Sequence, residues 1–171
     1  MERAPVDREA FGALYRAHAP AILNYLRRRL GDGAAAEDLT AETFLKAFVG
    51  IRRFQARGLP FRAWLYRIAT NLANSAQRRR RLRFLLFGDR PIEAKAAECK
   101  PNHDEGARHR ARAALATLSA NDQAVLVLRF VEGLSIEEAA QVLGCPPGTI
   151  QSRTARARER LRRRLERSVQ S

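Results

Sequence analysis

The chain has 171 residues, 46% of them hydrophobic, which is enough for one or two small domains with buried cores. Its 32 Lys and Arg residues outnumber its 18 Asp and Glu residues, so the formal net charge is +14. Such an excess favours a polyanionic partner, usually nucleic acid, over a membrane surface. No apolar run approaches the roughly 20 residues that span a bilayer, and no secretory signal is present, so we expect a cytoplasmic protein without membrane insertion.

Cysteine and histidine give no sign of a metal or catalytic site. Two cysteines, Cys99 and Cys145, are too few for a disulfide framework, and they lack zinc-site spacing with the three histidines. The histidines also sit in no visible catalytic triad. We therefore expect reduced thiols, no metal, no cofactor and no catalytic residue.

Helical spacing dominates the chain, and no stretch alternates apolar and polar residues for long enough to suggest a sheet. The fold class predicted is all-α, with two small helical domains joined by a flexible linker. Residues 1–81 form the first domain and residues 108–171 the second, and both are strongly basic. Residues 82–107 are the linker, with balanced charge and two prolines. Its apolar opening, residues 82–87, either caps the first domain or docks on a partner.

Three or four helices are expected in the first domain, and the pattern is clearest over residues 11–31, 34–54 and 60–81. In the second of these, four apolar side chains share one face and are predicted to be core: Ala41, Phe44, Phe48 and Ile51. Asp38 and Glu42 form an acidic ridge on the other side, beside Leu39. DNA would repel such a ridge, so it either contacts a protein partner or is ordinary solvated surface.

The third helix combines apolar residues with amides and ends in an arginine run at residues 78–81. Aromatic, amide and cationic side chains together suit single-stranded DNA, in which bases stack and cations hold the backbone. Phe61 and Trp64 are more typical of a core, so the loop at residues 55–60 is the better place for base capture.

The second domain carries a helix-turn-helix signature. Ser135 is a predicted N-cap, and acidic residues follow it in the first turn of the helix. Gly144 is a predicted helix end, and a second helix is expected to begin near Pro147 or Gly148. Ile150, Thr154, Ala157 and Leu161 form the stripe that should pack on the domain. The first residues of such a helix reach base edges. Candidates for contact with base edges are Gln151, Ser152, Arg153 and Arg156. Arg158, Arg160 and the later arginines are expected to meet phosphates or solvent.

Taken in order, these motifs resemble an extracytoplasmic-function (ECF) sigma factor of the sigma-70 superfamily. They are AEDLTAETFLKAF, then an F-x6-F pair leading into RAWLYRIATNLA and an arginine run, then SIEEAAQVLGCPPGTIQSRTARARERL. The resemblance covers residues 8–80 and 110–165. It implies a protein that binds core RNA polymerase and directs promoter-specific initiation, and that associates with the nucleoid when in holoenzyme. It also makes an anti-sigma factor an expected partner.

The resemblance assigns each motif a role. The first motif would dock on the coiled coil of the largest polymerase subunit, with Asp38, Leu39, Glu42 and Phe48 in the matching stretch. The first domain would read and melt the minus-ten element through Arg57, Gly58, Leu59, Pro60, Phe61, Asn71, Asn74, Arg78, Arg79 and Arg80. The second would read the minus-thirty-five element through Thr149, Gln151, Ser152, Arg153, Arg156, Arg158 and Arg160. The alternative is a helix-turn-helix regulator that acts without polymerase, and an enzyme is the least favoured class.

Overall fold

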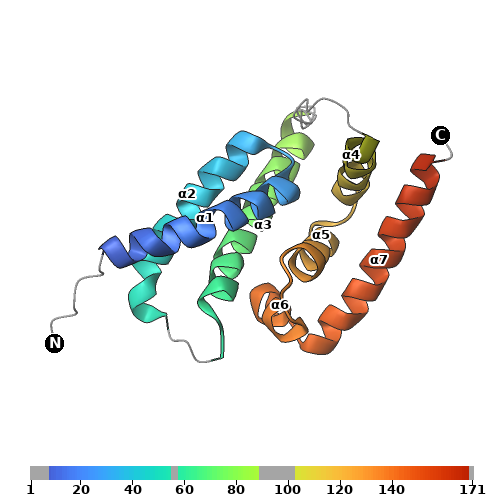
Figure 1. Cartoon of the computed structure of the whole chain (residues 1–171). Coiled ribbons are helices and arrows are strands. Elements are labelled where there is room, and N and C mark those ends of the chain that lie inside the picture. The colour runs from blue at the N-terminus through green and yellow to red at the C-terminus, as the bar shows by residue number, and fades with distance from the viewer. Residues whose placement is uncertain (1–7, 55–57, 89–102, 170–171) are drawn as a thin grey trace.

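The computed structural model describes residues 8–54, 58–88 and 103–169, and every regular element in those ranges is helical. Helices α1 to α3 form one group, and α4 to α7 form a second group that lies beside it (Figure 1). The predicted all-α class with two helical domains is therefore confirmed. The predicted linker lies largely in residues 89–102, outside the described residues.

The N-terminal domain consists of α1 (Arg8–Leu30), α2 (Gly33–Gly50) with the short 3-10 turn η1 (Ile51–Arg53), and α3 (Phe61–Phe87). The turn between α1 and α2 is sharp because Gly31 adopts a left-handed φ of 68°. Asp32 then caps α2, and its side chain accepts a hydrogen bond from the backbone N–H of Ala35 at 3.2 Å.

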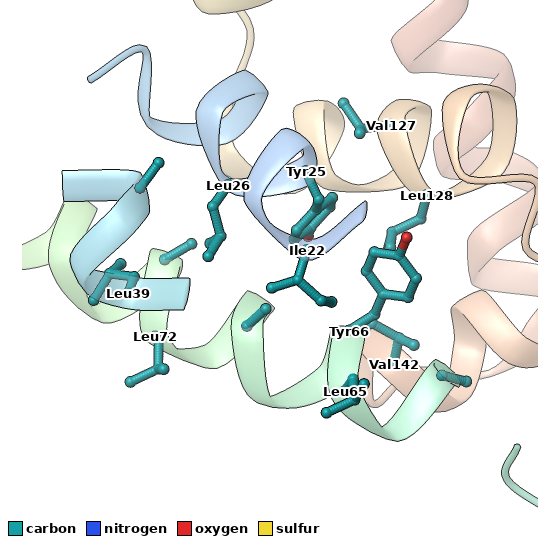
Figure 2. Close-up of a cluster of buried hydrophobic side chains, with 14 of the residues drawn as sticks. Ile22, Tyr25, Leu26, Leu39, Leu65, Tyr66, Leu72, Val127, Leu128 and Val142 are labelled. Atoms are coloured by element: carbon teal, nitrogen blue, oxygen red, sulfur yellow. The ribbon is translucent and has the colours of Figure 1, made fainter. Parts of the chain in front are cut away.

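Large side chains from all three helices meet in the core (Figure 2), among them Ile22, Leu26, Leu65 and Leu72. Two buried tyrosines contribute as well, and their polar ends are satisfied. The Tyr25 hydroxyl lies 2.8 Å from Oγ1 of Thr70, so this polar pair is buried without leaving a group unpaired.

The second helix differs in rotation from the sequence prediction. Ala41 was expected in the core and is exposed, whereas Leu39 was placed beside the acidic ridge and is buried at 8% exposure. Thr40 and Thr43 are buried too, because each hydroxyl donates to the carbonyl four residues earlier, at 2.7 and 2.6 Å. The two threonines thus lie on the buried face of α2, which the sequence prediction missed because threonine is polar.

The third helix continues six residues beyond the predicted domain boundary at residue 81. It ends at Phe87, where Gly88 adopts φ 63° and donates its N–H to the carbonyl of Phe84 at 3.0 Å. The segment before Gly88 contains no helix breaker. Residues 82–86 are exposed on this extension, so they do not cap the first domain in the manner proposed as one alternative.

The C-terminal domain contains α4 (His103–Ala116), α5 (Ala120–Leu126), the π-helical turn η2 (Val127–Val131), α6 (Ile136–Leu143) and α7 (Pro147–Val169). Helices α6 and α7 form the predicted helix-turn-helix. Ser135 caps α6 in a reciprocal capping box with Glu138, and Gly144 ends it with φ 63°. Ile150 and Ala157 are fully buried on the second core, as their spacing predicted.

Candidate protein- and nucleic-acid-binding surfaces

The outer face of α2 combines acidic and apolar side chains. Asp38 is exposed, and Glu42 is partly exposed and lies 3.3 Å from Nζ of Lys46. Leu45 and Val49, one and two turns further along the same face, are 64% and 72% exposed. Solvent exposure of two large apolar side chains beside a carboxylate ridge is typical of a protein-docking surface.

Two of the four predicted polymerase-contacting residues lie elsewhere on α2. Leu39 is in the core, and the ring of Phe48 packs edge-on against that of Phe11 with centroids 5.0 Å apart. Sequence reasoning missed Leu45 and Val49. The sequence spacing could have identified them. Leu45 follows Asp38 by seven residues and Val49 follows Glu42 by seven, which places the four side chains on one helical face.

The loop before α3 brings several predicted minus-ten residues together. Gly58 has a φ of 78°, a conformation that favours glycine, and Pro60 immediately precedes the first residue of α3. Leu59 is half-buried against the core. Arg57, also predicted for this loop, lies outside the described residues.

An aromatic cluster surrounds Phe61, the first residue of α3 after this loop. The ring of Phe61 lies 5.8 Å from that of Phe54 and 5.6 Å from that of Trp64, centroid to centroid. The ring of His18 lies 5.6 Å from Phe61 on the other side. The Phe61 ring is only partly exposed and contacts three other rings, so it is mainly a packing residue.

Further along α3, the two predicted DNA-contacting amides differ in solvent exposure and in hydrogen bonding. Asn71 is exposed, whereas Asn74 is half-buried and its Oδ1 accepts a hydrogen bond from Nη2 of Arg29 at 2.6 Å. Arg78 is exposed, with its guanidinium 3.3 Å from the Ser75 hydroxyl, and the next two arginines are exposed too. Asn71, Asn74 and Arg78 follow one strip of the helix, because they are three and seven residues apart.

The first turns of α7 present a polar, exposed surface. Gln151, Ser152 and Arg156 are exposed, while Thr149 and Arg153 are half-buried. The Arg156 side chain donates to the carbonyl of Ser152 at 3.3 Å, so it lies along the helix over its N-terminal turn. These side chains occupy the position from which a recognition helix reads base edges.

The two predicted phosphate-contacting arginines already have partners within the domain. The guanidinium carbon of Arg158 lies 5.7 Å from the ring centroid of Phe130, which is itself 58% exposed. Arg160 bonds to the buried carboxylate of Asp122 at 2.5 Å and thereby joins α7 to α5.

One carboxylate lies within the basic face of α7. Glu159 accepts hydrogen bonds from Arg163 at 2.8 Å and from Arg162 at 3.2 Å. These bonds hold the pKa of Glu159 below its ordinary value, so the side chain stays charged. Glu159 therefore neutralises part of the surface that follows Arg156.

Two further features bear on the class of protein. Within the described ranges, no three His, Cys, Asp or Glu side chains gather as a metal-binding group. None of the helices in the part of the chain that the structure describes has the length and apolar character needed to cross a membrane.

Comparison with known proteins gives a consistent picture across the chain. The sigma-70 region 2 model matches residues 14–83, and the sigma-70 region 4 model matches residues 108–161. The ECF RNA polymerase sigma factor BldN of Streptomyces coelicolor is 36% identical over 170 residues, which is 96% of this chain and 64% of BldN. The chain thus spans less than two thirds of that relative. SigL of Mycobacterium tuberculosis, another ECF sigma factor, is 33% identical over 90% of this chain and 88% of SigL.

A solved structure extends the similarity to the whole fold. The sigma factor RpoE, in complex with the anti-sigma factor NepR from Bartonella quintana, aligns with a TM-score of 0.80 and 30% sequence identity. The alignment covers 92% of this chain and 98% of RpoE, so it includes both helical domains.

Proposed function

Because the chain belongs to the ECF family of RNA polymerase sigma factors, we propose that it binds core RNA polymerase and directs promoter-specific transcription initiation. The observation that carries the proposal is the pairing, in one chain, of a basic helix-turn-helix with a second helical domain whose α2 exposes Asp38, Leu45 and Val49. A regulator that needs only DNA has no use for such a protein-docking face.

The docking face of α2 is proposed to contact the coiled coil of the largest polymerase subunit. Carboxylates on a domain of high positive charge would steer the protein-binding side toward a basic partner and away from DNA. Leu45 and Val49 would supply most of the buried apolar area. Asp38 and Glu42 would set orientation and association rate more than affinity.

The two DNA contacts are proposed to divide the promoter between the domains. The loop at residues 58–60, with Asn71 and the arginines that follow it on α3, would capture and hold the unpaired minus-ten strand. The exposed start of α7, centred on Ser152 and Arg156, would read the minus-thirty-five element in duplex form.

The remaining roles follow from this assignment. The chain would perform no bond chemistry of its own and would act in the cytoplasm, at the nucleoid when in holoenzyme. An anti-sigma factor is proposed as a regulatory partner, supported by the similarity to RpoE, which was solved with NepR. Such a partner would compete for the α2 docking face.

Run-off transcription with core polymerase on genomic promoter fragments tests the proposal. Specific initiation should appear with the wild-type chain and disappear with Leu45→Arg/Val49→Arg and with Asp38→Arg/Glu42→Arg. Glu37→Arg is the matched control, because Glu37 is exposed on another side of α2 and makes only a surface ion pair with Arg27. No initiation by the wild-type chain, together with salt-sensitive binding of duplex DNA, would instead support a helix-turn-helix regulator.

A further inference from the structure

The C-terminal end of α3 carries two exposed runs of residues, one cationic and one apolar. All arginines from position 78 to position 83 are exposed. The apolar residues there are Leu82, Phe84, Leu85 and Leu86, which are between 45% and 67% exposed. This end of the helix lies at the edge of the molecule (Figure 1). Four large apolar side chains thus lie in solvent within five consecutive positions, which is a patch rather than scattered exposure.

Three of these residues lie on the side of α3 that faces away from the core. Ala73 is fully buried and precedes Leu82 by nine residues, or two and a half turns, so the two side chains point in opposite directions. Leu85 and Leu86 lie within about 60° of Leu82 around the helix axis. These three side chains, called here the leucine face, are therefore not covered by the bundle to which α3 belongs.

Arginines border the leucine face on three sides. Arg81 and Arg83 lie about 100° to either side of Leu82 around the helix axis. Arg78 and Arg79 lie one turn before Leu82, on the same side of the helix. The long arginine stems can lie over apolar surface while their guanidinium groups reach anions. A partner for this surface should therefore be apolar inside and negatively charged at its boundary with water.

Phe84 restricts the kind of partner further, because it projects from the opposite side of the helix. Two residues of α-helix correspond to about 200° of rotation, so Phe84 lies about 160° from Leu82. A groove in a partner protein covers one side of a helix and would leave Phe84 in water. A second copy of this chain would bring two arginine borders together, and each chain has a formal net charge of +14. Nucleic acid would satisfy the arginines but offers no apolar phase to the leucine face.

An anionic lipid bilayer meets both requirements. Its interface can enclose the end of a helix from several sides, and its phosphates accept bidentate hydrogen bonds from guanidinium groups. Leu82 and Leu86 are about 6 Å apart along the helix axis, at a rise of about 1.5 Å per residue. Interfacial helices bury their apolar residues about 5–10 Å deep, at the boundary between headgroups and acyl chains. The apolar run therefore matches the depth of that boundary.

We propose that the end of α3 binds the surface of anionic membranes, with the leucine face and Phe84 at the acyl-chain boundary and the flanking arginines on lipid phosphates. The binding is peripheral and involves no membrane span. Leu85 follows Arg78 by seven residues, so the leucine face continues the strip of α3 that is proposed to contact the minus-ten strand. A membrane-bound chain therefore cannot place this strip on DNA. This consequence rests on the proposed function, whereas membrane binding itself does not.

Sedimentation of the full chain with lipid vesicles tests the proposal, without polymerase or DNA. Wild-type protein should bind vesicles of equal parts phosphatidylglycerol and phosphatidylcholine about ten-fold or more tightly than vesicles of phosphatidylcholine alone. Leu85→Gln/Leu86→Gln should weaken binding to the anionic vesicles about ten-fold or more, because two apolar side chains no longer leave water. Leu45→Gln/Val49→Gln is the matched control, since it removes two aliphatic side chains of comparable exposure from α2, and it should bind as the wild type does.

Equal binding of the two glutamine variants to anionic vesicles would overturn the proposal, and so would equal binding of the wild type to the two kinds of vesicle. A wild-type dimer in sedimentation velocity that Leu85→Gln/Leu86→Gln abolishes, with vesicle binding unchanged, would assign the leucine face to a second copy instead. Weaker binding of single-stranded DNA by the same variant, again with vesicle binding unchanged, would assign it to nucleic acid. Either result overturns membrane binding.

Two further measurements complete the test. If Leu85→Gln/Leu86→Gln loses helical content, Leu85→Ala/Leu86→Ala decides, because alanine favours the helix and also removes most of the apolar surface. Wild-type run-off transcription separates the two proposals. Initiation without vesicle binding contradicts only the membrane proposal, whereas vesicle binding without initiation contradicts only the sigma role.

Discussion

The guanidinium of Arg158 lies over the ring of Phe130, with 5.7 Å between the guanidinium carbon and the ring centroid. This contact ties α7 to η2 and turns Arg158 away from the side of the helix that carries Arg156. Two residues of α-helix correspond to about 200° of rotation, so the two arginines point in nearly opposite directions. Similar residues two positions apart in sequence therefore have different surroundings.

That difference predicts unequal effects on duplex DNA binding. Arg156→Ala should weaken binding of a minus-thirty-five duplex about ten-fold or more, because a base-edge or phosphate contact is lost. Arg158→Ala should weaken binding less than about three-fold and should lower stability by about 0.5–1 kcal/mol, the value of an exposed cation–π contact. Fluorescence anisotropy and urea unfolding measure the two effects. Equal losses of affinity would show that Arg158 leaves Phe130 to contact DNA.

Removal of the carboxylate of Glu159 should strengthen DNA binding. Glu159→Gln releases Arg163 from its ion pair and leaves Arg162 paired with Glu166 alone. The plot of log affinity against log salt should steepen by about one unit per additional phosphate contact. Glu166→Gln is the control, since Glu166 pairs with Arg162 two turns further from the start of the helix. If both variants raise affinity equally, general charge rather than position explains the effect.

The capping box makes the helix-turn-helix sensitive to one hydroxyl. Ser135→Ala should lower the free energy of unfolding by about 1 kcal/mol or slightly more, because it leaves the N–H of Glu138 without its acceptor and breaks the reciprocal pair. Ser119→Ala, which removes the simple N-cap of α5, should lower the free energy of unfolding by no more than Ser135→Ala does. Urea titrations with an unchanged slope provide the comparison. A larger loss for Ser119→Ala would contradict the importance of the reciprocal pair.

His18 should make stability depend on pH in a predictable direction. Burial, and secondarily the charge of Arg62, lower the pKa of His18 below its ordinary 6.5. Between that lower value and 6.5, the unfolded chain binds more protons than the folded chain, so the His18 contribution to stability falls as pH decreases through this window. His18→Gln should remove this component. Between pH 7.5 and 5, the free energy of unfolding should therefore decrease less steeply with falling pH for the variant than for the wild type. Identical slopes for the two proteins would contradict the prediction.

Short-range signals made the helix-turn-helix predictable from sequence. Ser135 caps the start of α6, and Gly144 ends that helix with a left-handed φ. Pro147 has no backbone N–H to donate and stands at the first position of α7. Each of these effects acts within a few residues. Helical spacing then placed Ile150 and Ala157 on the core without knowledge of what covers them. Such features depend on neighbours within about one or two helical turns, so the sequence by itself determined them.

Tertiary packing decided the rest. The rotation of α2 depends on its packing against α1 and α3. Leu39 is buried, and so is Thr40, whose hydroxyl donates to a carbonyl of its own helix, whereas Ala41 is exposed to solvent. The join between the domains depends on Tyr66 and Glu132, which are 66 residues apart and form a hydrogen bond only when two separate helical groups meet. No periodicity or capping signal encodes such a pair, because its free energy comes from burial shared between distant segments.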